Sequence, residues 1–466
     1  MDATTVYKEN SGETREERGS RRVSIALAIL AASAFLIQFF NKVIGTYLPY
    51  GALLMFAMLL LVLPMRRLCV SRGFFVSILW VPMLCMVFLQ LSTDRFSMNT
   101  ALDLFTYFVG ILLVFVAGND SSVFDKVIRV IVIAASIYAI SVFIQLLLPP
   151  IYRIYLACLR GDAGEKVLSY RSKYGQLTGF STNPSFAAGH IVSGLLAYAA
   201  VFFGGEKRLK RLDWILVAVM FGALLLTGKR GHLLGTVFAI LVCYLVNTRG
   251  AKRMRIVSIA LIVLACVIPF LIVFGEVLMT IPGVGRLAGL FVGLVNGEDV
   301  TSGRSRLYAY AITQFKAHPL FGIGWGKFRT SIVGVVTLQT ELEVHNIYLQ
   351  LLCETGLIGF IVTILPMVAF LMKALTNLTA INRNGGARGG IKVIAVFSLA
   401  YQLFFLVYGI SGNPLLDYNY VLLYFMACAM TAAIFRQLRL RRRQDIQSPE
   451  EPVDTSEEPG EQKEII

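Results

Sequence analysis

The chain has 466 residues, of which 56% are hydrophobic and only 15% are charged, and its mean hydropathy is +0.70. These values exclude a soluble globular domain and leave room for about a dozen apolar membrane spans and one sizeable loop. The formal net charge is +15, but the basic residues lie in short clusters between apolar runs. We therefore expect a lipid bilayer as partner and no nucleic acid.

The apolar runs predict an all-α integral membrane protein with about twelve transmembrane helices. Residues 1–22 are polar and are expected to form a disordered cytoplasmic tail, without a cleavable signal peptide. Helices one to nine fall within residues 23–274, at 23–40, 44–63, 74–91, 101–117, 127–148, 184–203, 212–226, 232–246 and 256–274. After a long loop at 275–345, helices ten to twelve fall within 346–436, at 346–371, 391–410 and 420–435, and residues 437–466 form a second disordered cytoplasmic tail.

The distribution of Lys and Arg predicts the orientation of these helices. Short cytoplasmic loops of membrane proteins carry an excess of basic residues. With both termini in the cytoplasm, the strongly basic short loops all fall on the inner side, around Arg66, Lys126, Lys207, Arg253 and Arg383. The loop at 275–345, the loop at 151–177 and the turn at Lys229 and Arg230 then lie on the outer side. Positive charge there is unexpected, and this makes those segments candidates for function.

Arg230 lies in the tight turn TGKRG between two apolar runs. An Arg at the start of a helix can bind an anion, because its planar guanidinium and the free backbone N–H groups of the first turn point the same way. The alternative is an interfacial anchor that extends toward lipid headgroups.

The long loop contains a second pair of cations, Arg304 and Arg306. They open a predicted helix that Thr301 or Ser302 could cap, and an apolar stripe at Leu307, Ala311 and Phe315 would let this helix lie against the membrane or the spans. A solvated loop arginine is the alternative for each.

His345 and Asn346 stand at the boundary between the long loop and the tenth helix. A His at an aqueous boundary can take a proton from an attacking hydroxyl, since its ordinary pKa is near neutrality. An interfacial His or a helix cap is the alternative. Glu354 lies about two turns further on, on the face of Gln350, and is predicted to pair with an Arg or to orient the polar site.

The segment PLFGIGWGKF (319–328) resembles a phosphate-binding glycine loop only weakly. We interpret its glycines as permitting a tight re-entrant path, with Trp325 and Phe328 as interfacial anchors. No D-x-D pair occurs on the outer face, so we expect neither a metal nor another cofactor.

Together these segments resemble the O-antigen ligase and polymerase superfamily of membrane glycosyltransferases. The resemblance covers roughly residues 179–360. It is carried by GFSTNPSFAAGH, by the turn TGKRG, and by an Arg followed by PLFGIGWGKF and HNIYLQLLCETG. It implies that Arg230, Arg304 and His345 are catalytic, with Lys229, Arg306, Asn346 and Glu354 in substrate binding. The chain has Lys229 where the family usually has Ser.

The resemblance also implies the substrates and the location. The donor would be a glycan on a polyprenyl-diphosphate carrier such as undecaprenyl diphosphate, and the acceptor a glycan hydroxyl. The enzyme would be a metal-independent, inverting glycosyltransferase of a bacterial plasma membrane that builds cell-envelope polysaccharide. Polymerase is narrowly preferred over ligase. A lipid-linked glycan flippase is the alternative, although such transporters usually carry inverted repeats and polar groups at the bilayer midplane.

Overall fold

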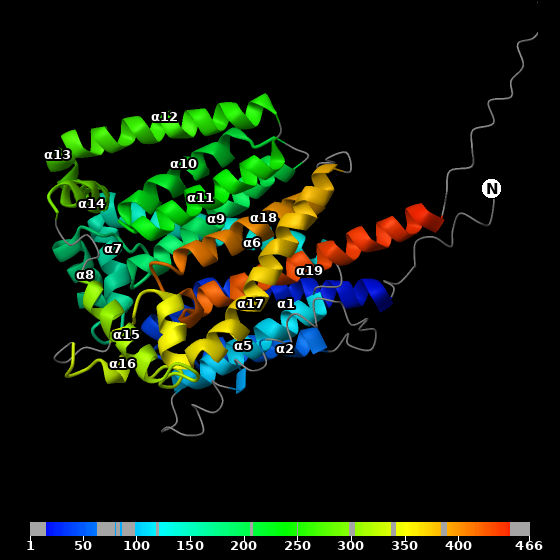
Figure 1. The fold of residues 1–466 in the computed structure, drawn as a ribbon, viewed down its shortest axis with the longest axis horizontal. Helices are drawn as coiled ribbons and strands as arrows, with labels where there is room; N and C mark the ends of the chain where they lie inside the picture. Colours follow the sequence, from blue (N-terminus) through cyan, green and yellow to red (C-terminus); the bar gives the residue numbers. More distant parts are fainter. Residues whose placement is uncertain are drawn as a thin grey trace, which may run out of the picture.

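The computed structural model describes residues 15–62, 80, 84–85, 98–117, 121–205, 208–248, 250–297, 303–336, 342–383 and 389–447. Over these residues the fold is all α, without a β-strand, and its helices pack into one bundle (Figure 1). The prediction of an all-α integral membrane protein is therefore confirmed.

Nine of the described helices are long and apolar enough to cross a membrane. They are α1 (Arg15–Phe39, continued by the π-turn Phe40–Ile44), α5 (Met98–Ala117), α6 (Asp125–Leu147, preceded by the 3-10 turn Ser122–Phe124), α9 (Pro184–Gly204), α11 (Arg230–Asn247), α12 (Ala251–Val273), α17 (Ile347–Arg383), α18 (Gly390–Tyr408) and α19 (Tyr418–Gln447).

Two further helices occupy predicted spans but are shorter: α2 (Leu48–Val62) and α10 (Arg211–Leu226). At 1.5 Å per residue they reach about 24 Å, which is less than the roughly 30 Å of a bilayer core. Helices therefore occupy eleven of the twelve predicted spans. The third, 74–91, lies outside the described residues except at positions 80, 84 and 85.

Helices α9 and α18 lie at the centre of the bundle, and α9 packs against α6, α10, α11 and α18. Small residues make this close approach possible. A side chain at Gly189 would collide with Tyr420, and one at Gly194 would collide with Ala135. Lipid gives little hydrophobic drive for helix association, so close packing of small residues supplies much of the attraction between membrane helices.

Helix α12 lies at the margin of the bundle, where it packs against two short helices, α13 (Gly275–Met279) and α14 (Val284–Val295) (Figure 1). Its apolar side chains are open to the surroundings, with Leu261 61% exposed and Val273 74% exposed. Such a helix is stable only in a hydrocarbon environment, which agrees with a bilayer around the bundle.

One end of the bundle, the loop end, carries the connecting helices α7 (Pro149–Cys158), α8 (Ala163–Tyr174), α14, α15 (Ser305–Ala317) and α16 (Phe328–Ser331) (Figure 1). The start of α1 and the basic end of α19 lie at the other end. The two loops predicted on the outer side, 151–177 and 275–345, thus lie together at one end. Which end faces the cytoplasm stays a prediction.

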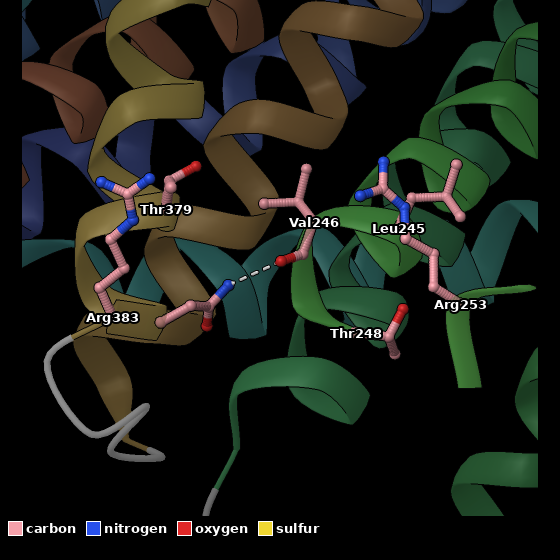
Figure 2. A pocket seen from close by; sticks show the side chains of 7 residues that line it. Leu245, Val246, Thr248, Arg253, Thr379 and Arg383 are labelled. Atoms are coloured by element: carbon pink, nitrogen blue, oxygen red, sulfur yellow. Dashed lines mark hydrogen bonds between the residues drawn. The ribbon is translucent and has the colours of Figure 1, made fainter. Parts of the chain in front are cut away.

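The end of α11 remote from the loop end borders a pocket of about 450 Å³ (Figure 2). Arg253 and Arg383 line it from two helices, and Asn382 Nδ2 donates to the carbonyl of Val246 at 3.1 Å. Both arginines belong to clusters that the sequence predicts to be cytoplasmic. This pocket is separated from Arg230 by the length of α11, about 27 Å, so it is distinct from the site described next.

Candidate active site

The turn between α10 and α11 places Lys229 and Arg230 at the loop end. Gly228 has φ +65°, a conformation that favours glycine, and a Cβ there would lie 3.2 Å from Gly283 Cα. Thr227 Oγ1 closes the end of α10 by donating to a carbonyl of its last turn at 2.6 Å. Lys229 takes the N-cap position and Arg230 is the first residue of α11. Both side chains therefore start beside free backbone N–H groups, which attract an anion.

Helix α14 brings a third cation, Arg286, to this turn. The Gly283 N–H donates to the carbonyl of Gly175 at 2.7 Å, which ties the start of α14 to the end of α8. Arg286 Cζ lies 5.8 Å from the centroid of the Tyr174 ring, at cation–π distance. Arg286 was not predicted from the sequence as a site residue. Arg286 is the only charged residue in the apolar helix α14, and a lone charge in an apolar helix is the signal that could have identified it.

Arg304 reaches the same region from the N-cap position of α15. Its Nη1 donates to the carbonyl of Ser411, in the connection between α18 and α19, at 2.8 Å. The predicted stripe on this helix is confirmed at Leu307 and Ala311, which are both buried. Thr301 and Ser302, the predicted caps, lie outside the described residues. Arg306 is exposed, and no contact with the cations above is found for it within the described residues.

His345 is held in an unusual backbone conformation. Its φ is +58°, and among the described residues it is the only non-glycine with positive φ. Such strain persists only where the surrounding structure enforces it, often at functional sites. Asn346 caps α17, since its Oδ1 accepts the N–H groups of Tyr348 at 3.1 Å and Leu349 at 3.2 Å. The helix-cap role thus falls to Asn346, and its predicted contact with substrate stays a prediction.

These groups form what we term the cationic cluster: Lys229, Arg230, Arg286 and Arg304, with His345 beside them. Arg286 and Arg304 both interact electrostatically with Arg230. Burial, reinforced by Arg286 and Arg304, lowers the pKa of Lys229 to about 7. Burial, reinforced by Arg304 and Lys229, lowers the pKa of His345 to about 4. The charges that produce these shifts are all positive, so a bound anion would relieve them.

Glycine-rich residues 319–328, which we call the glycine loop, pack into a break in α17 at Gly356, where φ is +64° and ψ is −169°. The N–H groups of Ile323 and Gly324 donate to the carbonyls of Cys353 and Glu354 at 2.9 and 2.8 Å. In return, Leu357 and Ile358 donate to carbonyls of the loop at 2.8 and 3.3 Å. These bonds replace those that the helix loses at its break. The glycines thus serve a backbone-to-backbone contact, and the path beneath the membrane surface stays a prediction.

Glu354 fastens this contact with its side chain. The buried carboxylate accepts the N–H of Gly326 at 3.0 Å, the N–H of Phe328 at 3.2 Å and the amide of Gln350 at 3.2 Å. Charge-assisted bonds of this kind are stronger than neutral ones. These contacts indicate that Glu354 holds the glycine loop in place. The predicted pairing with an arginine is not found among the described residues, and the predicted roles of Glu354 in orienting the polar site and in substrate binding stay predictions.

The prediction that Trp325 and Phe328 are interfacial anchors is wrong. Trp325 is 3% exposed and packs edge-on against Tyr107, and Phe328 is fully buried against Tyr310. Their rings fill the space between the glycine loop and the bundle, where burial removes far more apolar surface from water than an interfacial position would.

The comparison with protein families matches residues 215–364 to the family described as O-antigen ligase. This segment begins in α10, ends after the break in α17, and includes every member of the cationic cluster, His345 and the glycine loop. The comparison with curated proteins finds no match.

Proposed function

Because this chain carries an O-antigen ligase domain at residues 215–364 and belongs to the O-antigen ligase and polymerase superfamily, we propose that it transfers a glycan from a polyprenyl-diphosphate carrier to a glycan hydroxyl. The family match alone makes it an O-antigen ligase-type membrane enzyme of polysaccharide assembly. The observation that carries the finer proposal is the convergence of four basic side chains and His345 from four separate segments of the chain.

In the proposed reaction, the cationic cluster binds the diphosphate of the donor. Arginine suits this task because its planar fork can bind two phosphate oxygens at once. The oxygen of the acceptor hydroxyl forms a bond to the anomeric carbon of the donor sugar as the bond from that carbon to the diphosphate breaks. The electron pair leaves with the polyprenyl diphosphate, whose growing charge the cluster stabilises. A single displacement of this kind inverts the configuration at the anomeric carbon.

His345 accepts the proton of the attacking hydroxyl in this scheme. Without donor, the neighbouring cations keep the imidazole neutral and weakly basic, because they lower its pKa to about 4. A bound diphosphate offsets these cations and raises the pKa, so the imidazole becomes a better base when the donor is in place. A positioned base of this type contributes roughly 10²–10⁴-fold in rate.

Purified protein in lipid nanodiscs tests the proposal when it is given a polyprenyl-diphosphate glycan, alone and with candidate acceptors. We expect the glycan to leave the carrier and appear on the acceptor. A ladder of products marks a polymerase, which we favour narrowly, and a single transfer marks a ligase. Movement of the intact lipid-linked glycan across a liposome bilayer, without transfer, would replace the enzyme proposal with the flippase.

Variants of the arginines sharpen this test. Arg230→Lys, Arg304→Lys and Arg286→Gln should each reduce transfer at least about tenfold, since they remove the bidentate fork or the charge. Arg306→Gln is the comparison variant, and its loss should be smaller, because Arg306 is exposed beside Arg304 on the same helix. Full activity in all three cluster variants would contradict a role for the cluster in the reaction.

A further inference from the structure

A large cavity opens at the loop end of the bundle. Its volume is about 1160 Å³, above the roughly 300–1,000 Å³ of pockets that enclose a drug-sized molecule. The glycine loop, α5, α8, α9 and the connection before α19 all contribute to its lining. No member of the cationic cluster lines it. Two lining residues link the cavity to the cluster. The ring of Tyr174 lies beneath Arg286, and Glu343 is two residues before His345 in the chain.

The lining combines carboxylates, amides and aromatic rings. Asp103, Glu343 and Asp417 supply the carboxylates, while Trp325 and Tyr418 are among the rings. The carboxylates act on one another electrostatically, but no group of three or more His, Cys, Asp or Glu in the described part of the chain is placed to hold a metal ion. Lysines and an arginine also line the cavity, so neither sign of charge dominates. Such a lining suits a neutral ligand that offers both apolar faces and many hydroxyl groups.

Two polar groups that line this cavity form no hydrogen bond within the described residues. Asn419 is 3% exposed and lines the cavity, yet its side-chain amide forms no hydrogen bond with any described residue. The half-buried Asp417 carboxylate likewise forms no hydrogen bond or ion pair with a described residue, although Arg329 attracts it electrostatically. Glu343 differs, because Arg329 contacts its carboxylate at 2.8 Å and Asn413 donates to it at 2.9 Å. A polar group removed from water without a hydrogen bond is costly, so Asp417 and Asn419 are groups to which a ligand could bond.

We propose that this cavity binds sugar rings of the acceptor glycan, with Asp417 and Asn419 forming hydrogen bonds to sugar hydroxyls. This inference rests on the function proposed above. The donor diphosphate belongs at the cationic cluster, and an inverting attack requires the acceptor to approach from the opposite side of the donor sugar. Glu343 lines the cavity and is two residues from His345 in the chain, which connects the cavity to the proposed base. Burial and the nearby carboxylates Glu343 and Asp103 raise the pKa of Asp417, so this carboxyl can also be protonated and donate to a sugar oxygen.

The test measures acceptor and donor dependence separately in nanodiscs. Asp417→Ala should raise the KM for acceptor about tenfold, the effect of a lost hydrogen bond to a sugar hydroxyl, and leave the KM for donor unchanged. Glu165→Ala is the matched control, because Glu165 is an exposed carboxylate on α8 at the same end of the bundle and does not line the cavity. An equal effect of both substitutions, or a rise in the donor KM alone, would overturn the acceptor assignment.

A second variant covers a failure of Asp417→Ala to fold. Thr330 is exposed on α16 and lines the cavity, so Thr330→Trp should fill part of it without disturbing the core and should also raise the acceptor KM. Mild acid releases the lipid-free oligosaccharide from the cell's own polyprenyl-diphosphate glycan. Binding of this oligosaccharide to the protein is then measured by titration, without any turnover. Binding that Thr330→Trp abolishes supports the cavity even if transfer fails and the proposed function falls. Transfer with an unchanged acceptor KM in both variants refutes the cavity and leaves the proposed function standing.

Discussion

Replacing Gly356 with alanine should detach the glycine loop from α17. Gly356 has φ +64°, and a Cβ there would lie closer than 3.0 Å to the backbone of Leu320, a separation that real side chains do not adopt. The two backbones must then separate toward the ordinary contact distance of 3.4 Å. The hydrogen bond from Ile358 N–H to the Leu320 carbonyl is already 3.3 Å long, so this separation breaks it.

The cost has two parts. Alanine at φ +64° and ψ −169° lies in a region that essentially only glycine occupies, which costs roughly 1–3 kcal/mol, and a buried backbone group without its hydrogen bond costs roughly 1–3 kcal/mol. The sum is on the order of 3 kcal/mol for one broken bond, enough to depopulate the docked loop by about a hundredfold. The loop carries Gly326 and Lys327 into the large cavity, so transfer should fall together with stability.

Gly161→Ala is the matched control, because Gly161 has φ +62° and a Cβ there meets nothing within 4 Å. Gly161→Ala therefore incurs only the cost of placing alanine at a positive φ, without a steric clash. The assay compares the thermal midpoint in detergent and the transfer rate in nanodiscs for the two variants. Gly356→Ala should lower both well below Gly161→Ala. Equal losses in the two variants would refute the idea that contact between the loop and the helix break organises this site.

Four further predictions concern the cluster and the membrane. The pKa of Lys229 is lowered to about 7, so its cationic form is lost as pH rises through 7. The affinity of the protein for a short-chain prenyl diphosphate should therefore fall between pH 6 and 8. Lys229→Arg should remove this pH dependence. His345→Ala should reduce transfer roughly 10²–10⁴-fold with normal membrane insertion, and near-normal turnover in His345→Gln would mean that the residue only positions the acceptor. Transfer should survive excess EDTA, and loss of activity with rescue by a divalent metal would contradict metal independence. Cysteines at Lys210 and Val335 should differ in intact cells, with only the second labelled by an impermeant thiol reagent; equal labelling would overturn the orientation.

The sequence alone was sufficient for the membrane helices that the structure describes, because each one follows from the apolar run of its own residues. Helix α9 at Pro184–Gly204 and helix α6 at Asp125–Leu147 lie within a few residues of their predicted positions. The same holds for the turn TGKRG and for the boundary between the long loop and α17 at His345. At both places charged or polar residues interrupt long apolar stretches. Hydropathy depends on neighbours in the chain, so it needs no knowledge of the packing.

The tertiary structure decided which polar groups meet and which are buried. Arg286 joins Arg230 because the start of α14 docks onto α8, and Glu354 serves the glycine loop because α17 breaks at Gly356. The large cavity draws Asp103 and Asp417 from segments more than 300 residues apart. Periodicity cannot reveal such meetings, since they depend on how separate helices pack against one another. That packing also buried Trp325 and Phe328, although aromatic residues of this kind often serve as anchors at a membrane surface.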